Sequence, residues 1–117
     1  MPNFQQLDVY KVSQEYIKEI YLVTRNFPKD EKFGLIDQIR RAVISIAANI
    51  AEGCGRYHAK DFIQFLRIAR GSCYEVVALL DASINLEYLS KQDHDALYIK
   101  AERINKMLSA LINSIKK

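Results

Sequence analysis

Glycine and proline are scarce in this chain, with four glycines and two prolines among 117 residues. Both residues disfavour helices, so their scarcity permits long helices. Cysteine is also rare, since only Cys54 and Cys73 are present. The sequence shows no features of a secretory leader. We therefore expect free, reduced thiols and a cytoplasmic protein.

Long apolar runs are also missing. No run approaches the roughly 18 residues that a membrane-spanning helix needs. Arg40 and Arg41 interrupt the best candidate. We therefore expect no contact with a membrane.

Residues that carry catalysis are sparse. The only histidines, His58 and His94, fall at opposite ends of the helical bundle predicted below, and two ligands do not make a zinc site. Ser45 and Ser72 have no histidine at their level, so nucleophilic catalysis is unsupported. We expect a non-enzymatic protein with no catalytic residue, no metal and no cofactor.

The stretch from Gly34 to Arg56 is nearly apolar all round. On a helical wheel, one wide apolar face is formed by Leu35, Ile36, Ile39, Ala42, Val43, Ile46, Ala47 and Ile50. A second apolar side is formed by Ile44, Ala48 and Ala51. The polar strip that remains consists of Gln38, Arg41, Ser45, Asn49 and Glu52. A surface helix of a small monomer needs one apolar stripe. We therefore expect this helix to pack on its own domain and on another copy of the chain.

Helical spacing of apolar residues predicts four helices, at about 7–26, 34–53, 59–87 and 91–116. Phe27-Pro28 ends the first helix, and the glycines around Cys54 end the second. Short connectors between helices of this length are typical of an all-α, antiparallel up-down-up-down four-helix bundle. At 117 residues we expect a single domain, residues 1–117.

The charge balance is mildly basic, with a formal net charge of +3 and a pI near 8.9. Such a balance permits an acidic partner without demanding one.

Gly71 lies in the middle of the third predicted helix, where glycine costs about 1 kcal/mol relative to alanine. We therefore expect a packing reason, namely a close approach by a neighbouring helix backbone. Centring the preceding turn near Arg56 places Glu52 level with Lys60 and Ser45 level with Arg67. The same register places Arg41 level with residues 71–75.

Two interpretations of Arg40 and Arg41 remain open. The pair could bind phosphate, or one arginine could pair with Glu75, inside the bundle or across a subunit contact. We favour the ion pair, and we assign Asn49 and Glu52 to the same structural or interface class.

The third helix carries a second basic group. Lys60, Arg67 and Arg70 recur on one side of it, and Lys60 could pair with Glu52. A solvated face is the simpler interpretation, and contact with a polyanion is the alternative. If the strip touches nucleic acid, we expect Lys60, Arg67, Arg70 and Arg56 to carry that contact.

A long pattern of residues resembles a known family. Its residues are Phe27-Pro28, Glu31, Phe33-Gly34-Leu35, Gln38 to Ala42, Ser45-Ile46, Asn49 to Gly53, Arg56, Phe65-Leu66, Ile68-Ala69, Gly71-Ser72 and Glu75. The pattern is similar to the four-helix-bundle proteins encoded in intervening sequences of bacterial 23S rRNA genes, also labelled S23 ribosomal proteins. That family in turn resembles the accessory variability protein of diversity-generating retroelements.

The resemblance implies a bundle that assembles into a five-fold barrel, and a nucleic-acid-associated or scaffolding role without known enzymatic activity. The chain departs from the pattern at Ala47, where the family usually carries proline. Proline there would kink the helix, so we expect a straighter helix and an altered subunit contact.

Three functions compete on this evidence. The first is an oligomeric module, by resemblance a homopentamer, that binds RNA or DNA through a basic surface. The second is an oligomeric adaptor for a protein partner such as a reverse transcriptase. The third is an enzyme, for which the sequence offers no catalytic constellation.

Overall fold

The computed structural model describes residues 3–116. Four α-helices account for most of the chain: α1 Asp8–Thr24, α2 Leu35–Cys54, α3 Ala59–Asn85 and α4 Lys91–Lys116. Two short 3-10 helices, η1 Phe4–Gln6 and η2 Lys29–Glu31, precede α1 and α2. No strand occurs within this range, so the predicted all-α class and the four helices are confirmed. Residues 1, 2 and 117 of the predicted domain lie outside the described range.

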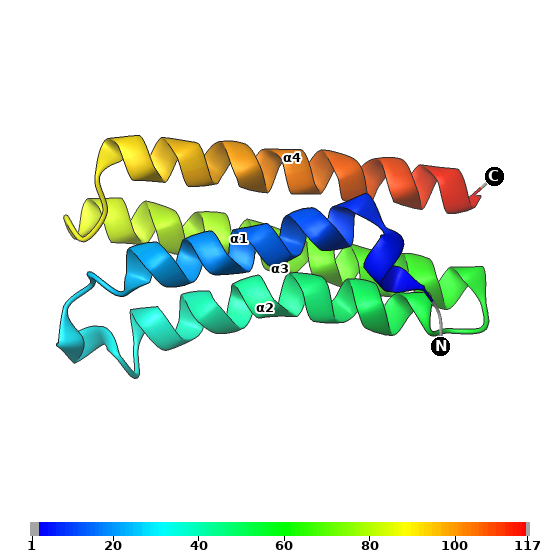
Figure 1. Ribbon diagram of the computed structural model, residues 1–117, viewed down its shortest axis with the longest axis horizontal. Coiled ribbons are helices and arrows are strands. Elements are labelled where there is room, and N and C mark those ends of the chain that lie inside the picture. Colours follow the sequence, from blue (N-terminus) through cyan, green and yellow to red (C-terminus); the bar gives the residue numbers. More distant parts are fainter. Residues whose placement is uncertain (1–2, 117) are drawn as a thin grey trace.

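The four helices lie side by side in an elongated body of 44 × 23 × 20 Å. Figure 1 shows the chain turning back at each of its three connections, so that successive helices point in opposite directions. α1 and α3 each pack against both α2 and α4, and the contact between α2 and α3 is the most extensive. Each helix therefore has two neighbours within the chain and one side facing outward.

The core is built from the predicted apolar stripes. On α2 the wide apolar face is buried from Leu35 to Ile50 except for the half-buried Ile36, and the helix continues without interruption through the buried Ala47. The second apolar side behaves differently, because Ile44 is 43% exposed and Ala48 is also exposed. The chain's own helices therefore leave part of the second apolar side of α2 uncovered, although Ala51 on that side is half-buried.

Two polar side chains are buried in the core and bond to the backbone of α4. The Tyr16 hydroxyl donates to the Leu97 carbonyl at 3.0 Å, and the Cys73 thiol donates to the Ala101 carbonyl at 3.3 Å. Burial raises the pKa of Cys73 to about 12 and raises that of Tyr16 as well. Both groups therefore stay protonated and remain hydrogen-bond donors, which satisfies them inside the core.

The predicted register between α2 and α3 is wrong by more than one helical turn. Ser45 lies level with Ser72, and their hydroxyls are 2.9 Å apart, whereas the prediction placed Ser45 level with Arg67. α2 ends at Cys54, within one residue of the predicted end, so the helix bounds do not explain the error. The Ser45–Ser72 contact centres the pairing of the two helices between His58 and Ala59, whereas the prediction assumed pairing centred at Arg56.

The prediction for Gly71 is also wrong within the chain. A Cβ atom built at Gly71 would meet no atom within 4 Å, so no helix of the same chain approaches there. The close approach occurs at Gly53, where a Cβ would lie 2.7 Å from the Cβ of Phe65 and 3.0 Å from the ring of Phe62. Glycine is therefore required by packing on α2, at the α2–α3 contact.

Candidate nucleic-acid interface

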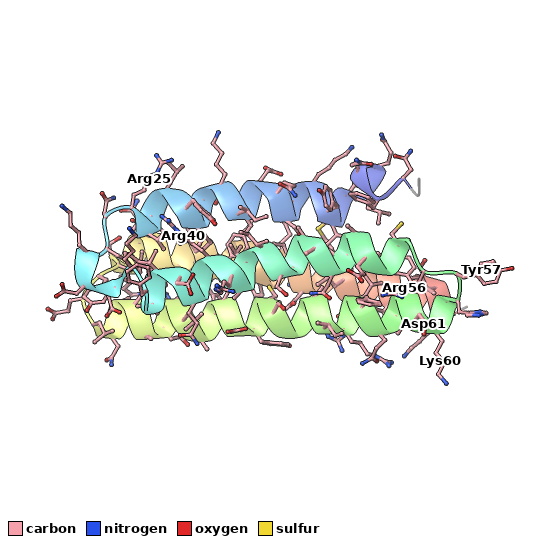
Figure 2. The ribbon with its side chains drawn as sticks, turned by 90° about the horizontal axis from the view of Figure 1, so that it is seen from below. Arg25, Arg40, Arg56, Tyr57, Lys60 and Asp61 are labelled. Carbon is pink, nitrogen blue, oxygen red and sulfur yellow. The ribbon has the colours of Figure 1, made fainter. Side chains whose placement is uncertain are left out.

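Three cations line a groove between the N-terminal part of α3 and the C-terminal part of α4. We call it the end groove; it has a volume of about 390 Å³ and is lined by Lys60, Asp61, Ile63, Gln64, Arg67 and Lys116. Lys60, Arg67 and Lys116 are exposed, and Figure 2 shows Lys60 and Asp61 at one end of the bundle. Within residues 3–116, neither Lys60 nor Arg67 forms an ion pair.

Arg70 does not belong to that exposed strip, contrary to the prediction. Its side chain is half-buried, and Nη1 donates to the Ser109 hydroxyl on α4 at 3.1 Å. It lines a second groove between α3 and α4, which also contains Tyr74 and Tyr98 and has a volume of about 730 Å³. We call this second groove the tyrosine groove, and the two grooves together the α3–α4 seam.

Arg56 is engaged by residues of its own chain. Its Nη2 atom lies 2.9 Å from Glu52 Oε1, and its guanidinium lies 4.7 Å from the centre of the Phe65 ring. The predicted pair between Lys60 and Glu52 is therefore wrong. Because Glu52 offsets the charge of Arg56, Lys60 and Arg67 are the stronger candidates for binding phosphate.

Arg40 and Arg41 make different contacts from those predicted. Arg40 lies between α1 and α2 (Figure 2), where Nε donates to Thr24 Oγ1 at 2.9 Å and the guanidinium lies 4.3 Å from the Tyr21 ring centre. Arg41 pairs with Asp37 one turn away, at 3.0 Å. The predicted ion pair with Glu75 inside the bundle is therefore wrong, because Arg40 faces α1 rather than α3. A pair across a subunit contact stays a prediction.

Asn49 belongs to a polar cluster between α2 and α3. Its side-chain amide donates to the Ser45 carbonyl at 2.8 Å and to the Ser45 hydroxyl at 2.9 Å. The Ser45 hydroxyl in turn bonds to Ser72. Both serines therefore hold neighbouring helices together.

With this geometry in place, comparison with known proteins identifies the family. Residues 5–110 match the family described as 23S rRNA-intervening sequence protein. The chain belongs to this family. No curated protein matches the chain.

A solved structure is similar over most of its length. It is the crystal structure at 1.70 Å of a protein of unknown function from the S23 ribosomal protein family of Bacteroides thetaiotaomicron VPI-5482. The two chains are 30% identical, with a TM-score of 0.80, and the match covers 89% of this chain and 97% of the other. The predicted resemblance to the intervening-sequence proteins is thus confirmed, whereas the link to retroelement accessory proteins stays a prediction.

The structure explains one residue of the intervening-sequence protein pattern that the sequence reasoning left without a role. Glu31 Oε1 accepts a hydrogen bond from the Leu35 backbone N–H at 3.2 Å, and Oε2 accepts one from the Tyr88 hydroxyl at 3.1 Å. The first bond satisfies an N–H at the start of α2. The second ties that start to the α3–α4 connection, so Glu31 fixes one end of the bundle. The sequence signal for this role is the position of Glu31, an acid four residues before the first residue of α2.

His94 joins α3 to α4 at the same end. Its Nε2 atom lies 2.8 Å from Asp81 Oδ1, and its Nδ1 atom lies 3.1 Å from Asp95 Oδ1. The hydrogen bonds to Asp81 and then to Asp95 raise the pKa of His94 above its ordinary value. The charged imidazole is therefore favoured in the folded protein.

This contact makes stability depend on pH. Because the pKa is raised on folding, the stabilisation is complete below the unfolded-state value of about 6.5 and is lost as pH rises through the higher folded-state value. We expect the melting temperature to fall as the pH is raised above about 6.5, and the His94→Gln variant to lose that part of the pH dependence. Melting curves by circular dichroism between pH 6 and about 8.5 test this. An equal fall in both proteins would contradict it.

Two kinds of feature are absent from the described residues. Within residues 3–116, no three side chains of histidine, cysteine, aspartate or glutamate are placed to hold a metal ion. In the same range, no helix is both long and apolar enough to span a membrane. The α3–α4 seam is lined by five cations, Lys60, Arg67, Arg70, Lys106 and Lys116, and by two acids, Asp61 and Glu102.

Proposed function

We propose that this intervening-sequence protein is a non-enzymatic, up-down-up-down four-helix module that forms a homopentamer and binds RNA or DNA through its α3–α4 seam. The observation that carries the binding proposal is the end groove. Lys60, Arg67 and Lys116 line it with one acid, Asp61. Clustered cations that are not neutralised by their own chain are suited to phosphate contact.

The outer side of α2 supports the proposed assembly. Ile44 and Ala48 are exposed, and together with Ala51 and Tyr10 they line an apolar groove of about 230 Å³ between α1 and α2. Phe33, at the start of α2, is 87% exposed. A second copy of the chain would cover this surface, and the five-fold number follows from the family resemblance.

Assembly would strengthen binding to nucleic acid. A formal charge of +3 on each chain becomes +15 on five copies, since 5 × 3 = 15. A field of that size attracts polyanions and raises association rates.

A binding comparison between two charge-matched variants tests the proposal. Lys60→Ala/Arg67→Ala removes two cations of the end groove, and Lys11→Ala/Lys18→Ala removes two exposed cations from α1. Loss of two charged hydrogen-bond donors is expected to weaken binding by at least about tenfold, and by similar factors for different sequences. Fluorescence anisotropy with structured RNA, duplex DNA and single strands measures the affinities.

The control variant separates a local contact from a general charge effect. We expect Lys11→Ala/Lys18→Ala to bind within a few-fold of the wild type, since α1 lies outside the seam. Equal weakening in both variants would argue against a site at the end groove. Absence of binding to every nucleic acid would favour the adaptor for a protein partner, such as a reverse transcriptase.

A further inference from the structure

The tyrosine groove has features that phosphate binding alone does not require. Tyr74 on α3 and Tyr98 on α4 line it, and they are 63% and 43% exposed. An aromatic ring that faces water forgoes the free energy gained by burying its apolar surface. Exposed rings beside a groove are suited to stacking on a planar ligand such as a base. Tyr98 already stacks on His94, with ring planes 14° apart. One face of Tyr98 is thereby supported by its own chain.

The same groove contains an amide whose hydrogen bonding is incomplete. Asn105 lines the groove, and its Oδ1 atom is shielded from solvent and has no hydrogen-bond partner within residues 3–116. A buried acceptor without a partner is costly, and such groups call for an explanation. The terminal torsion of asparagine is soft, so turning the amide toward the groove breaks no hydrogen bond of Oδ1. A ligand with an amino group would satisfy that oxygen.

Cations connect the tyrosine groove to the end groove. Arg70 and Lys106 line the tyrosine groove with one acid, Glu102. Arg67, in the end groove, comes one turn before Arg70 on the same helix. A strand whose phosphates follow these cations would pass both grooves, and its bases would reach the tyrosines.

We propose that the tyrosine groove binds an unpaired base of a nucleic acid strand, stacked on Tyr74 and Tyr98 and read along its edge by Asn105. The side-chain amide of asparagine can accept a hydrogen bond from the adenine amino group and donate one to the adenine ring nitrogen, so the preferred base is adenine. The inference rests on the proposed function and deepens it, because it selects single-stranded over fully paired nucleic acid. Paired bases are stacked inside a duplex and do not offer a face to the tyrosines.

Binding of three RNAs of equal length tests this inference: oligoadenylate, oligouridylate and a fully paired duplex. Base stacking on aromatic side chains is strong enough that Tyr74→Ala/Tyr98→Ala should weaken oligoadenylate binding by about tenfold or more, with duplex binding unchanged. Tyr57→Ala is the control, because Tyr57 is 95% exposed and lies in the α2–α3 connection, outside the tyrosine groove. Asn105→Ala should reduce the preference for oligoadenylate over oligouridylate.

The outcomes distinguish this inference from the proposed function. If the tyrosine variant binds every RNA as the wild type does, while Lys60→Ala/Arg67→Ala weakens them all, the base site is overturned and the phosphate site stands. If the wild type binds none of these RNAs and no DNA in the comparison above, both proposals fail. If the tyrosine variant loses its oligomeric state in light scattering, the groove is a contact between copies of the chain, which overturns the base site.

Discussion

Gly53→Leu is expected to lower the free energy of unfolding by about 3 kcal/mol. Overpacking a core contact typically costs about 1–3 kcal/mol, and this contact is tight enough for the upper value. A Cβ at this position would already lie 2.7 Å from the Cβ of Phe65, which a rotation of the Phe65 side chain cannot relieve. The helices α2 and α3 would have to move apart along their most extensive contact. The gain in helix propensity, about 1 kcal/mol, offsets only part of the loss.

Gly71→Leu is the matched control for this effect. Gly71 has open space around its Cβ position, so the same change should gain helix propensity without a clash and raise stability by up to about 1 kcal/mol. Urea unfolding followed by circular dichroism measures both changes. If Gly71→Leu were the more destabilising of the two, the assigned orientation of α3 would be contradicted.

The wild-type protein is expected to have a mass near 67.5 kDa in solution, five times the 13.5 kDa of one chain, and Ala48→Glu is expected to reduce it to that of one chain. Ala48 lies on the uncovered apolar side of α2, so the glutamate would place an unpaired charge in each contact. Burying an unpaired charge costs several kcal/mol. Static light scattering at micromolar concentration measures the mass.

Ala96→Glu makes the same chemical change at an exposed position on α4. We expect this variant to keep the wild-type mass, because α4 is not assigned to the contact. A wild-type protein that is monomeric would contradict the assembly. A pentamer that Ala48→Glu leaves intact would place the contact on another face.

The helices and their buried faces could be predicted from sequence because they depend on local periodicity. The wide apolar face of α2 is buried almost throughout. The exposure of Ile44 and Ala48 also agrees with a second apolar side that the chain itself does not cover. Spacing along one helix was sufficient for these inferences.

The wrong predictions all depended on where one helix lies against another. Centring the pairing of α2 and α3 at Arg56 shifted every residue of α3 against α2, although the end of α2 was predicted to within one residue. Arg41 pairs with Asp37 of its own helix rather than with Glu75, and Gly71 has no neighbour within the chain, so both errors concern the direction in which a helix face points. Arg70 was assigned to an exposed strip because spacing does not reveal that Ser109 of α4 lies beside it. Long-range packing decides such contacts.

The salt dependence of binding tests the central claim, phosphate contact at the end groove, most directly. The logarithm of the binding constant should fall linearly with the logarithm of salt concentration. Each lost phosphate contact flattens the slope by roughly 0.7 for single strands and 0.9 for duplexes. Lys60→Ala/Arg67→Ala removes two cations, so it should flatten the slope by at least about 1.4 and about 1.8, respectively. The Lys11→Ala/Lys18→Ala control should keep the wild-type slope. Equal slopes for the wild type and the Lys60→Ala/Arg67→Ala variant would contradict phosphate contact by the end groove.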